Sequence, residues 1–178
     1  MFVLQLPQMV SRMTEFDLIK LAERAVENLK KQNKTLALAE SCTGGWVSKL
    51  ITDVSGASAV YQGGVCSYSN EVKMKVLGVK EDTLNSFGAV SEQVAVQMAE
   101  GVKKALNSDV GIGITGIAGP LSDNTAKPVG LIYVCLADGN KTTCIELRNN
   151  FTENIRLQNR MSAAKTALTL LGDINEEE

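Results

Sequence analysis

Two short apolar runs, each followed at once by a turn that contains glycine, constrain the fold of this chain more than any other feature. Thr35 to Ala39 reads TLALA and leads into ESCTGG, and Val110 to Ile114 reads VGIGI and leads into TGIAGP. Apolar runs of this length, bounded by turn residues, are typical of strands buried on both faces under helices. We therefore expect a sheet between two helical layers, with both turns at the carboxyl edge of the strands.

The segments around these runs alternate between helical and extended patterns. Apolar residues recur at helical spacing over 14–31, where Thr14 and Asp17 have the spacing of a capping box. Further helices are predicted over 70–77, from Ser91 to about 106 and from about 153 to 171, and strands over 61–68, 129–136 and 142–147, the last two joined at Asp138-Gly139. This order predicts the α/β class with three layers.

The length and composition fit one domain. Of the 178 residues, 44% are hydrophobic and only 4% aromatic, which suits a core of Val, Leu, Ile and Ala. We assign residues 13–172 to this domain and residues 173–178 to a solvated acidic tail. Residues 1–12 are a loose N-terminal extension, because they lack the runs of a signal peptide or a membrane helix. We therefore expect a cytoplasmic protein that does not contact a membrane.

The charge balance restricts the partners. A formal net charge of -2 provides no sequence-wide basic field for a phosphate backbone, because such binding depends on Lys and Arg. We expect no nucleic-acid partner. An anionic ligand would have to be small and bound locally.

Histidine is absent from the chain. This removes Ser-His-Asp and Cys-His catalysis, and it deprives a metal site of its commonest ligand. If the protein is an enzyme, another group carries the proton.

The four cysteines lack CxxC spacing and are interpreted as reduced thiols: Cys42, Cys66, Cys135 and Cys144. A thiol at the start of a helix, as at Cys42, can have a lowered pKa and act as a nucleophile. Without histidine it would depend on lysine or the helix dipole, so we interpret Cys42 as a small packed side chain.

The turn after the first strand can hold an anion. Ser41 leaves the strand, and the amides of Thr43, Gly44 and Gly45 can point outward at the start of the next helix, as an anion or oxyanion site does. From spacing alone, an equal alternative is that Ser41 or Thr43 only caps the helix and the glycines allow close packing.

Lys73 lies in the first turn of the helix over 70–77, which Asn70 can cap. A lysine base needs its pKa lowered from ~10.4 to about 7 to 8, and a helix terminus contributes only about 0.3 to 1 kcal/mol of that. Burial would have to supply most of the lowering. Taken alone, Lys73 also fits a solvated surface lysine.

Two further features fit a ligand, the second of them a phosphate. Thr115, Gly116 and Gly119 belong to a second glycine-containing loop after a buried strand, where a ligand can approach the backbone closely. Arg156 and Arg160 are spaced i, i+4 and share one helical face. Each feature has a plain alternative, an ordinary turn and an exposed basic face respectively.

Five blocks along the chain resemble the CinA-like family, the nicotinamide-nucleotide amidohydrolases that also occur as the C-terminal domain of competence/damage-inducible proteins. The blocks are, in order, LALAESCTGGWVSKLI, YSNEVKMKVLGV, GAVSEQVAVQMAEGV, TGIAGP and KPVG. The resemblance runs from about Glu15 to Leu171. It implies a single-domain three-layer α/β/α sandwich around a mixed, largely parallel sheet.

The resemblance also implies an activity, hydrolysis of the amide of nicotinamide mononucleotide to nicotinate mononucleotide and ammonia. It implies no metal and no cofactor, and its partner is a small nucleotide substrate; a homodimer is left open. By position, Ser41 is the nucleophile, Lys73 the base, and Tyr68 an aid to proton transfer. The amides of residues 43–45 would hold the oxyanion, and the loop over 115–119 with Arg156 the phosphate.

This sequence departs from the family pattern on the substrate side. Thr115 stands where serine is usual, and 121–126 reads LSDNTA where the family is glycine-rich. The stretch over 151–156 is one residue longer than the usual F-x-G-D-R and lacks its glycine. Two alternatives therefore stay open: a hydrolase with a shifted substrate, and a silent nucleotide-binding protein that reports nucleotide levels to a partner.

Overall fold

The protein is built on a five-stranded mixed sheet with the strand order β2-β1-β3-β4-β5. The computed structural model describes residues 14–122 and 125–174. The strands are β1 (Leu36–Glu40), β2 (Tyr61–Cys66), β3 (Val110–Gly116), β4 (Leu131–Asp138) and β5 (Lys141–Arg148). β1 pairs in parallel with β2 and β3, and β4 runs antiparallel to β3 and β5. The parallel strands are the ones that lead into the predicted site.

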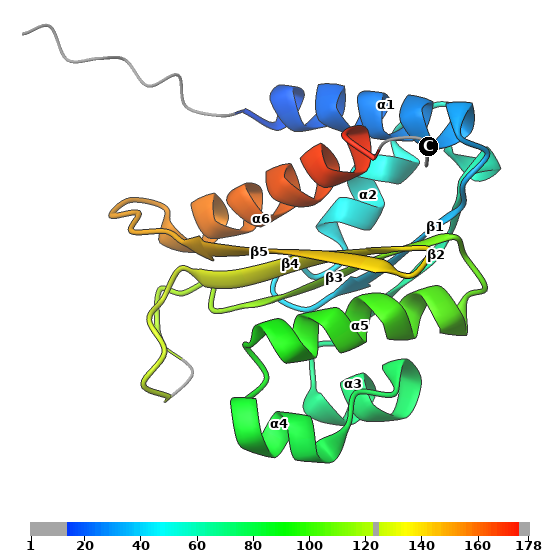
Figure 1. Cartoon of the computed structure of the whole chain (residues 1–178). Coiled ribbons are helices and arrows are strands. Elements are labelled where there is room, and N and C mark those ends of the chain that lie inside the picture. The colour runs from blue at the N-terminus through cyan, green and yellow to red at the C-terminus, as the bar shows by residue number, and fades with distance from the viewer. Residues whose placement is uncertain (1–13, 123–124, 175–178) are drawn as a thin grey trace, which may run out of the picture.

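Helices cover both faces of the sheet, as Figure 1 shows. α1 (Glu15–Lys31), α2 (Trp46–Thr52) and α6 (Ile155–Gly172) lie on one face and α5 (Glu92–Ala105) on the other, with α3 (Asn70–Leu77) and α4 (Glu81–Phe87) packed against α5. A single 3-10 turn, Ala57–Ala59, precedes β2. The predicted three-layer α/β/α arrangement in one domain is confirmed.

The two faces of β1 carry side chains of different size. Leu36 and Leu38 belong to the larger core cluster, shared with α1, α2 and α6, whereas Ala37 and Ala39 belong to the cluster shared with α5. Small residues on the α5 side let this helix lie close to the sheet. At Gly113 of β3 the approach is so close that an added Cβ would lie 2.2 Å from the carbonyl oxygen of Ala95.

Most of the predicted helix starts are confirmed. Thr14 and Asp17 form the expected capping box, and the Ser91 hydroxyl accepts a hydrogen bond from the Val94 amide at 3.3 Å. The prediction that Asn70 caps α3 is wrong, because Ser69 is the N-cap and Asn70 is already helical.

One of the cysteine predictions is also wrong. Cys135 on β4 and Cys144 on β5 are directly paired in the antiparallel ladder, and they form a disulfide. Cys42 and Cys66 are free thiols, the first buried and the second exposed. A pairing register of this kind cannot be deduced from cysteine spacing alone.

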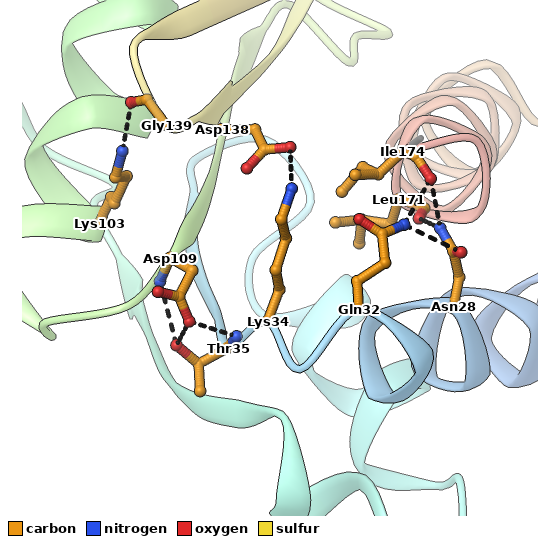
Figure 2. Close-up of polar contacts among 10 residues, drawn as sticks. All are labelled: Asn28, Gln32, Lys34, Thr35, Lys103, Asp109, Asp138, Gly139, Leu171 and Ile174. Carbon is orange, nitrogen blue, oxygen red and sulfur yellow. Dashed lines mark hydrogen bonds and ion pairs between the residues drawn. The ribbon is translucent and has the colours of Figure 1, made fainter. Parts of the chain in front are cut away.

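Polar contacts gather near the starts of β1 and β3 (Figure 2), the end of the sheet opposite to Ser41, which follows β1. Lys34 pairs with Asp138 at 2.8 Å, and Lys103 donates to the Gly139 carbonyl. The side chain of Asn28 on α1 donates to the carbonyls of Leu171 and Ile174.

The chain ends are only partly described. Asp173 and Ile174, at the start of the predicted acidic tail, contact α1, and the rest of that tail lies outside the described residues. The predicted extension over 1–12 lies outside them too. In the part of the chain that the structure describes, no helix has the length and apolarity to cross a membrane.

Candidate functional site

Ser41 and Lys73 lie side by side although 32 residues separate them in the sequence. Ser41 follows β1 directly, and its amide donates to the carbonyl of Ile114 on β3 at 3.0 Å. Lys73 lies in the first turn of α3, and its Nζ is 3.2 Å from Ser41 Oγ and 2.6 Å from the carbonyl oxygen of Ser67. A serine hydroxyl and an amine therefore meet at the carboxyl edge of β1.

The environment of Lys73 disfavours its charged form. The residue is only 1% exposed, and burial lowers the pKa of its amine. A negative charge on Cys42 would act in the opposite direction, but burial raises the pKa of that thiol to about 12, so it is uncharged near neutral pH. Among the described residues, Lys73 forms no ion pair. A neutral amine is the form that can accept a proton from serine.

Glu40 is a buried residue of this site that sequence reasoning missed. Its carboxylate accepts hydrogen bonds from the amides of Gly45 (3.0 Å), Val47 (3.1 Å) and Ser48 (2.8 Å) and from the Ser48 hydroxyl (2.7 Å). A glutamate at the end of an otherwise apolar run, before a helix start, is the signal that could have pointed to it.

Two of the three amides predicted for an oxyanion site already have acceptors. The Gly44 amide donates to the Ser41 carbonyl, and the Gly45 amide donates to Glu40. The amide of Thr43, and that of Cys42 before it, donate to no acceptor outside their own residue among the described residues. α2 itself begins only at Trp46. Of the three predicted amides only that of Thr43 thus lacks an acceptor in another described residue, and the Cys42 amide, one residue nearer to Ser41, lacks one as well.

The second predicted loop is mostly occupied by its own packing. The Thr115 hydroxyl is buried and donates to the Ala89 carbonyl at 2.8 Å. Gly116 packs against Ile132, where an added Cβ would lie 2.6 Å from a side-chain carbon. Gly119, which has φ +77°, contacts a predicted phosphate ligand, because its carbonyl accepts from Arg156 at 3.0 Å.

Two arginines of α6 connect the loops around the site. Arg156 donates to the Gly119 carbonyl and, at 3.2 Å, to the hydroxyl of Tyr68, which is 68% exposed. Arg160 donates to the Thr43 carbonyl at 2.8 Å and lies 5.1 Å from the ring centre of Trp46. Within the described residues Tyr68 has no hydrogen bond to Ser41 or Lys73. It is thus joined to Arg156 and not directly to the Ser41–Lys73 pair.

Two hollows flank Leu157 beside these arginines. One, of about 390 Å³, is lined by Gly44, Gly45, Trp46, Lys49, Leu157 and Arg160. The other, of about 430 Å³, is lined by Pro120, Thr152, Asn154, Ile155, Arg156 and Leu157. Volumes in this range are common for small-molecule sites.

A larger hollow, of about 490 Å³, lies at the opposite edge of the sheet and includes none of the predicted site residues. Three or more side chains of the types that bind metals (His, Cys, Asp, Glu) are gathered nowhere in residues 14–122 and 125–174.

Comparison with known proteins identifies relatives along almost the whole chain. The family model described as the CinA C-terminal domain matches residues 18–174. A CinA-like protein of Thermotoga neapolitana is 48% identical over 147 residues, which cover 81% of this chain and 35% of that protein. A CinA-like protein of Syntrophomonas wolfei is 51% identical over 143 residues, 80% of this chain and 34% of that protein. The chain thus spans about a third of the length of the curated relatives that it matches.

Solved structures agree with these relatives. The competence/damage inducible protein CihA from Agrobacterium tumefaciens is 36% identical, with a TM-score of 0.82 over 87% of this chain and 93% of that one. A CinA superfamily protein from Escherichia coli has a TM-score of 0.83 at 27% identity, over 92% and 94% of the two chains. On the sequence match and the shared fold together, this chain belongs to the family of the CinA C-terminal domain.

Proposed function

We propose that this protein is an amidohydrolase that converts nicotinamide mononucleotide and water to nicotinate mononucleotide and ammonia. The observation that carries the proposal is the buried amine of Lys73, 3.2 Å from Ser41 Oγ and without an ion-pair partner among the described residues. The resemblance to nicotinamide-nucleotide amidohydrolases supplies the substrate. The absence of histidine leaves lysine as the base that can activate a serine.

In the first half of the reaction, the carbonyl of Ser67 accepts one N–H of neutral Lys73, so the lone pair of Nζ is free to take the proton of Ser41. Ser41 Oγ attacks the carboxamide carbon and forms a C–O bond. The oxyanion accepts hydrogen bonds from the amides of Cys42 and Thr43. Lys73 then returns the proton to the amide nitrogen, the C–N bond breaks, and ammonia leaves.

In the second half, water gives a proton to Lys73 and attacks the acyl-enzyme. The C–O bond to Ser41 breaks, nicotinate mononucleotide leaves, and the proton returns to Ser41. The overall balance is one water consumed and one ammonia released.

We place the part of the substrate beyond the reacting carboxamide in the hollows on either side of Leu157. Arg156 and Arg160 lie at the walls of these hollows, and a guanidinium group suits a phosphate because its donors form a planar fork. The two guanidinium groups of α6 would then bind the negatively charged phosphate.

The test is ammonia release from nicotinamide mononucleotide by the wild-type protein and by Lys73→Ala. We expect the substitution to lower kcat/KM by about 10²- to 10⁴-fold, the usual contribution of a general base. The matched control is Lys75→Ala, which removes an exposed lysine of the same helix, paired with Glu71. Nicotinamide riboside serves as the substrate without phosphate and should be hydrolysed poorly.

A wild-type protein that releases no ammonia, yet binds the mononucleotide in a calorimetric titration, would overturn the enzyme assignment in favour of a binding role. Equal activity of Lys73→Ala and Lys75→Ala would overturn the assignment of Lys73 as base.

A further inference from the structure

The carboxylate of Glu40 has no capacity left for chemistry. It is 1% exposed, and each of its oxygens accepts two hydrogen bonds: Oε2 from the amides of Gly45 and Val47, and Oε1 from the amide and hydroxyl of Ser48. A carboxylate offers about four lone-pair positions, so these four donors fill them. It therefore has no position free to take a proton from substrate or water.

The main chain of Glu40 is joined to the other half of the site. Its carbonyl accepts the Ser67 amide at 2.8 Å, and the Ser67 carbonyl in turn accepts Lys73 Nζ at 2.6 Å. Glu40 also pairs with Ile114 in the sheet, next to the bond that fixes the Ser41 amide. One residue thus connects the turn that carries the serine with the carbonyl that holds the lysine.

We propose that Glu40 is a positioning residue that sets the geometry of the Ser41–Lys73 pair without taking part in proton transfer. Its side chain accepts hydrogen bonds from Gly45 and the start of α2, and its main chain directly precedes Ser41. Glu40 thus fixes both ends of the turn over 41–45. This leaves the amides of Cys42 and Thr43 free of internal acceptors. The carboxylate of Glu40 binds Gly45 and the first residues of α2. It therefore forms no ion pair with Lys73.

The chemistry of the contacts requires a carboxylate and not its amide. All four partners of Glu40 donate hydrogen. Glutamine has nearly the same shape, but its NH₂ group would face two of these donors. Glu40→Gln therefore removes two of the four contacts with little change in volume, and an overpacked or hollow core does not complicate the result.

The proposal rests on the proposed function only in treating Ser41 as a nucleophile, and the test uses that property directly. A fluorophosphonate probe, which forms a phosphorus–oxygen bond to an activated serine and releases fluoride, is added to the wild-type protein and to Glu40→Gln. Modified protein is followed by intact mass over a range of pH. The matched control is Glu27→Gln, an exposed glutamate of α1 paired with Lys31.

We expect Glu40→Gln to be modified about 10²-fold more slowly, since displacement of a reacting group by ~1 Å can cost that much. The pH midpoint of the rate should stay where it is in the wild-type protein, because Lys73 keeps its surroundings. Hydrogen exchange at the amides of Val47 and Ser48 should become faster. On the amide substrate, kcat should fall and KM should not change.

A wild-type rate of modification in Glu40→Gln would overturn the positioning role and leave the proposed function intact. A shifted pH midpoint would also overturn the positioning role, because Glu40 would then act by changing the protonation of Lys73. If the wild-type protein itself neither reacts nor releases ammonia, Ser41 is no nucleophile, and both proposals fail together.

Ser48→Ala keeps the test decisive if Glu40→Gln does not fold. It removes one of the four contacts, the hydroxyl bond, and leaves the three amides in place. We expect a smaller, several-fold loss of rate, and an unchanged rate would count against the proposal.

Discussion

Lys73 differs from its neighbour Lys75 in what surrounds the amine. Lys75 is exposed and pairs with Glu71 one helical turn away. Lys73 is buried, and its amine meets a hydroxyl and a carbonyl but no carboxylate among the described residues. Burial without a counter-charge penalises the ammonium form of Lys73 and favours the neutral amine that the proposed function requires.

The pH dependence of the reaction follows from this difference. In the proposed mechanism the neutral amine is the active form, and burial lowers the pKa of Lys73 from its ordinary value of 10.5. We therefore expect kcat/KM to rise with pH and to level off at a pH below that value. Lowering the pH protonates Lys73, so activity is lost on the acidic side of its pKa. The measurement is kcat/KM for ammonia release at constant ionic strength from pH 5 to 10.

The control for the pH profile is Lys75→Ala, which should give the same curve as the wild-type protein. A rate that does not vary over this range, or one that rises only above the pKa of free lysine, would argue that Lys73 is not the base.

At the scale of elements, the contact between α5 and β3 depends on glycine. An added Cβ at Gly113 would lie 2.2 Å from the Ala95 carbonyl and 2.6 Å from the Ala99 amide nitrogen, both of which are backbone atoms of α5. We expect Gly113→Ala to push the helix away from the sheet and to lower the free energy of unfolding by about 1 to 3 kcal/mol. Urea denaturation measures this change.

Gly172→Ala is the matched control at the end of α6. There the nearest atoms belong to the flexible side chain of Arg24, at 3.2 Å or more, and alanine is the better helix former. The control should be neutral or stabilising, and a similar loss in both variants would show that crowding against α5 is not the cause.

Local sequence patterns predicted most elements well but not the details at their ends. Buried strands and amphipathic helices have strong periodic signals, and β1, β3 and α3 were found within one or two residues. The cap of α3 was assigned one residue too late, because Ser69 and Asn70 are both good capping residues. The start of α2 was placed before the left-handed glycines Gly44 and Gly45, whose φ values of 61° and 89° delay the helix to Trp46.

At the scale of the whole molecule, residue types alone leave alternatives open for Ser41 and Lys73, and the family resemblance selects this pair. The two side chains do lie together. The role of Thr115 could not be anticipated, because its hydroxyl is taken by Ala89, which lies 26 residues earlier. Contacts that join distant segments leave no periodic signal in the sequence. Glu40 is a different case, because its side-chain partners lie only five to eight residues away and its position at the end of an apolar run is the local signal.

The pairing of β4 with β5 makes a prediction about thiols. With the Cys135–Cys144 disulfide formed, protein denatured without reductant should have two cysteines that alkylate, Cys42 and Cys66. After reduction it should have four. Mass spectrometry of the alkylated chain counts them, and four reactive thiols without reductant would mean that the isolated protein keeps both sulfur atoms as thiols.

The arginines of α6 have a consequence for the order in which a ribosome makes the site. Ser41 and Lys73 are synthesised long before Arg156 and Arg160, which bind the carbonyls of Gly119 and Thr43. α6 also supplies Ala163, Ala164, Ala167, Leu168 and Leu171 to the larger core cluster. A nascent chain that has not yet reached α6 therefore lacks both guanidinium groups and the helix that packs against α1, so the surroundings of Ser41 and Lys73 are completed late in synthesis.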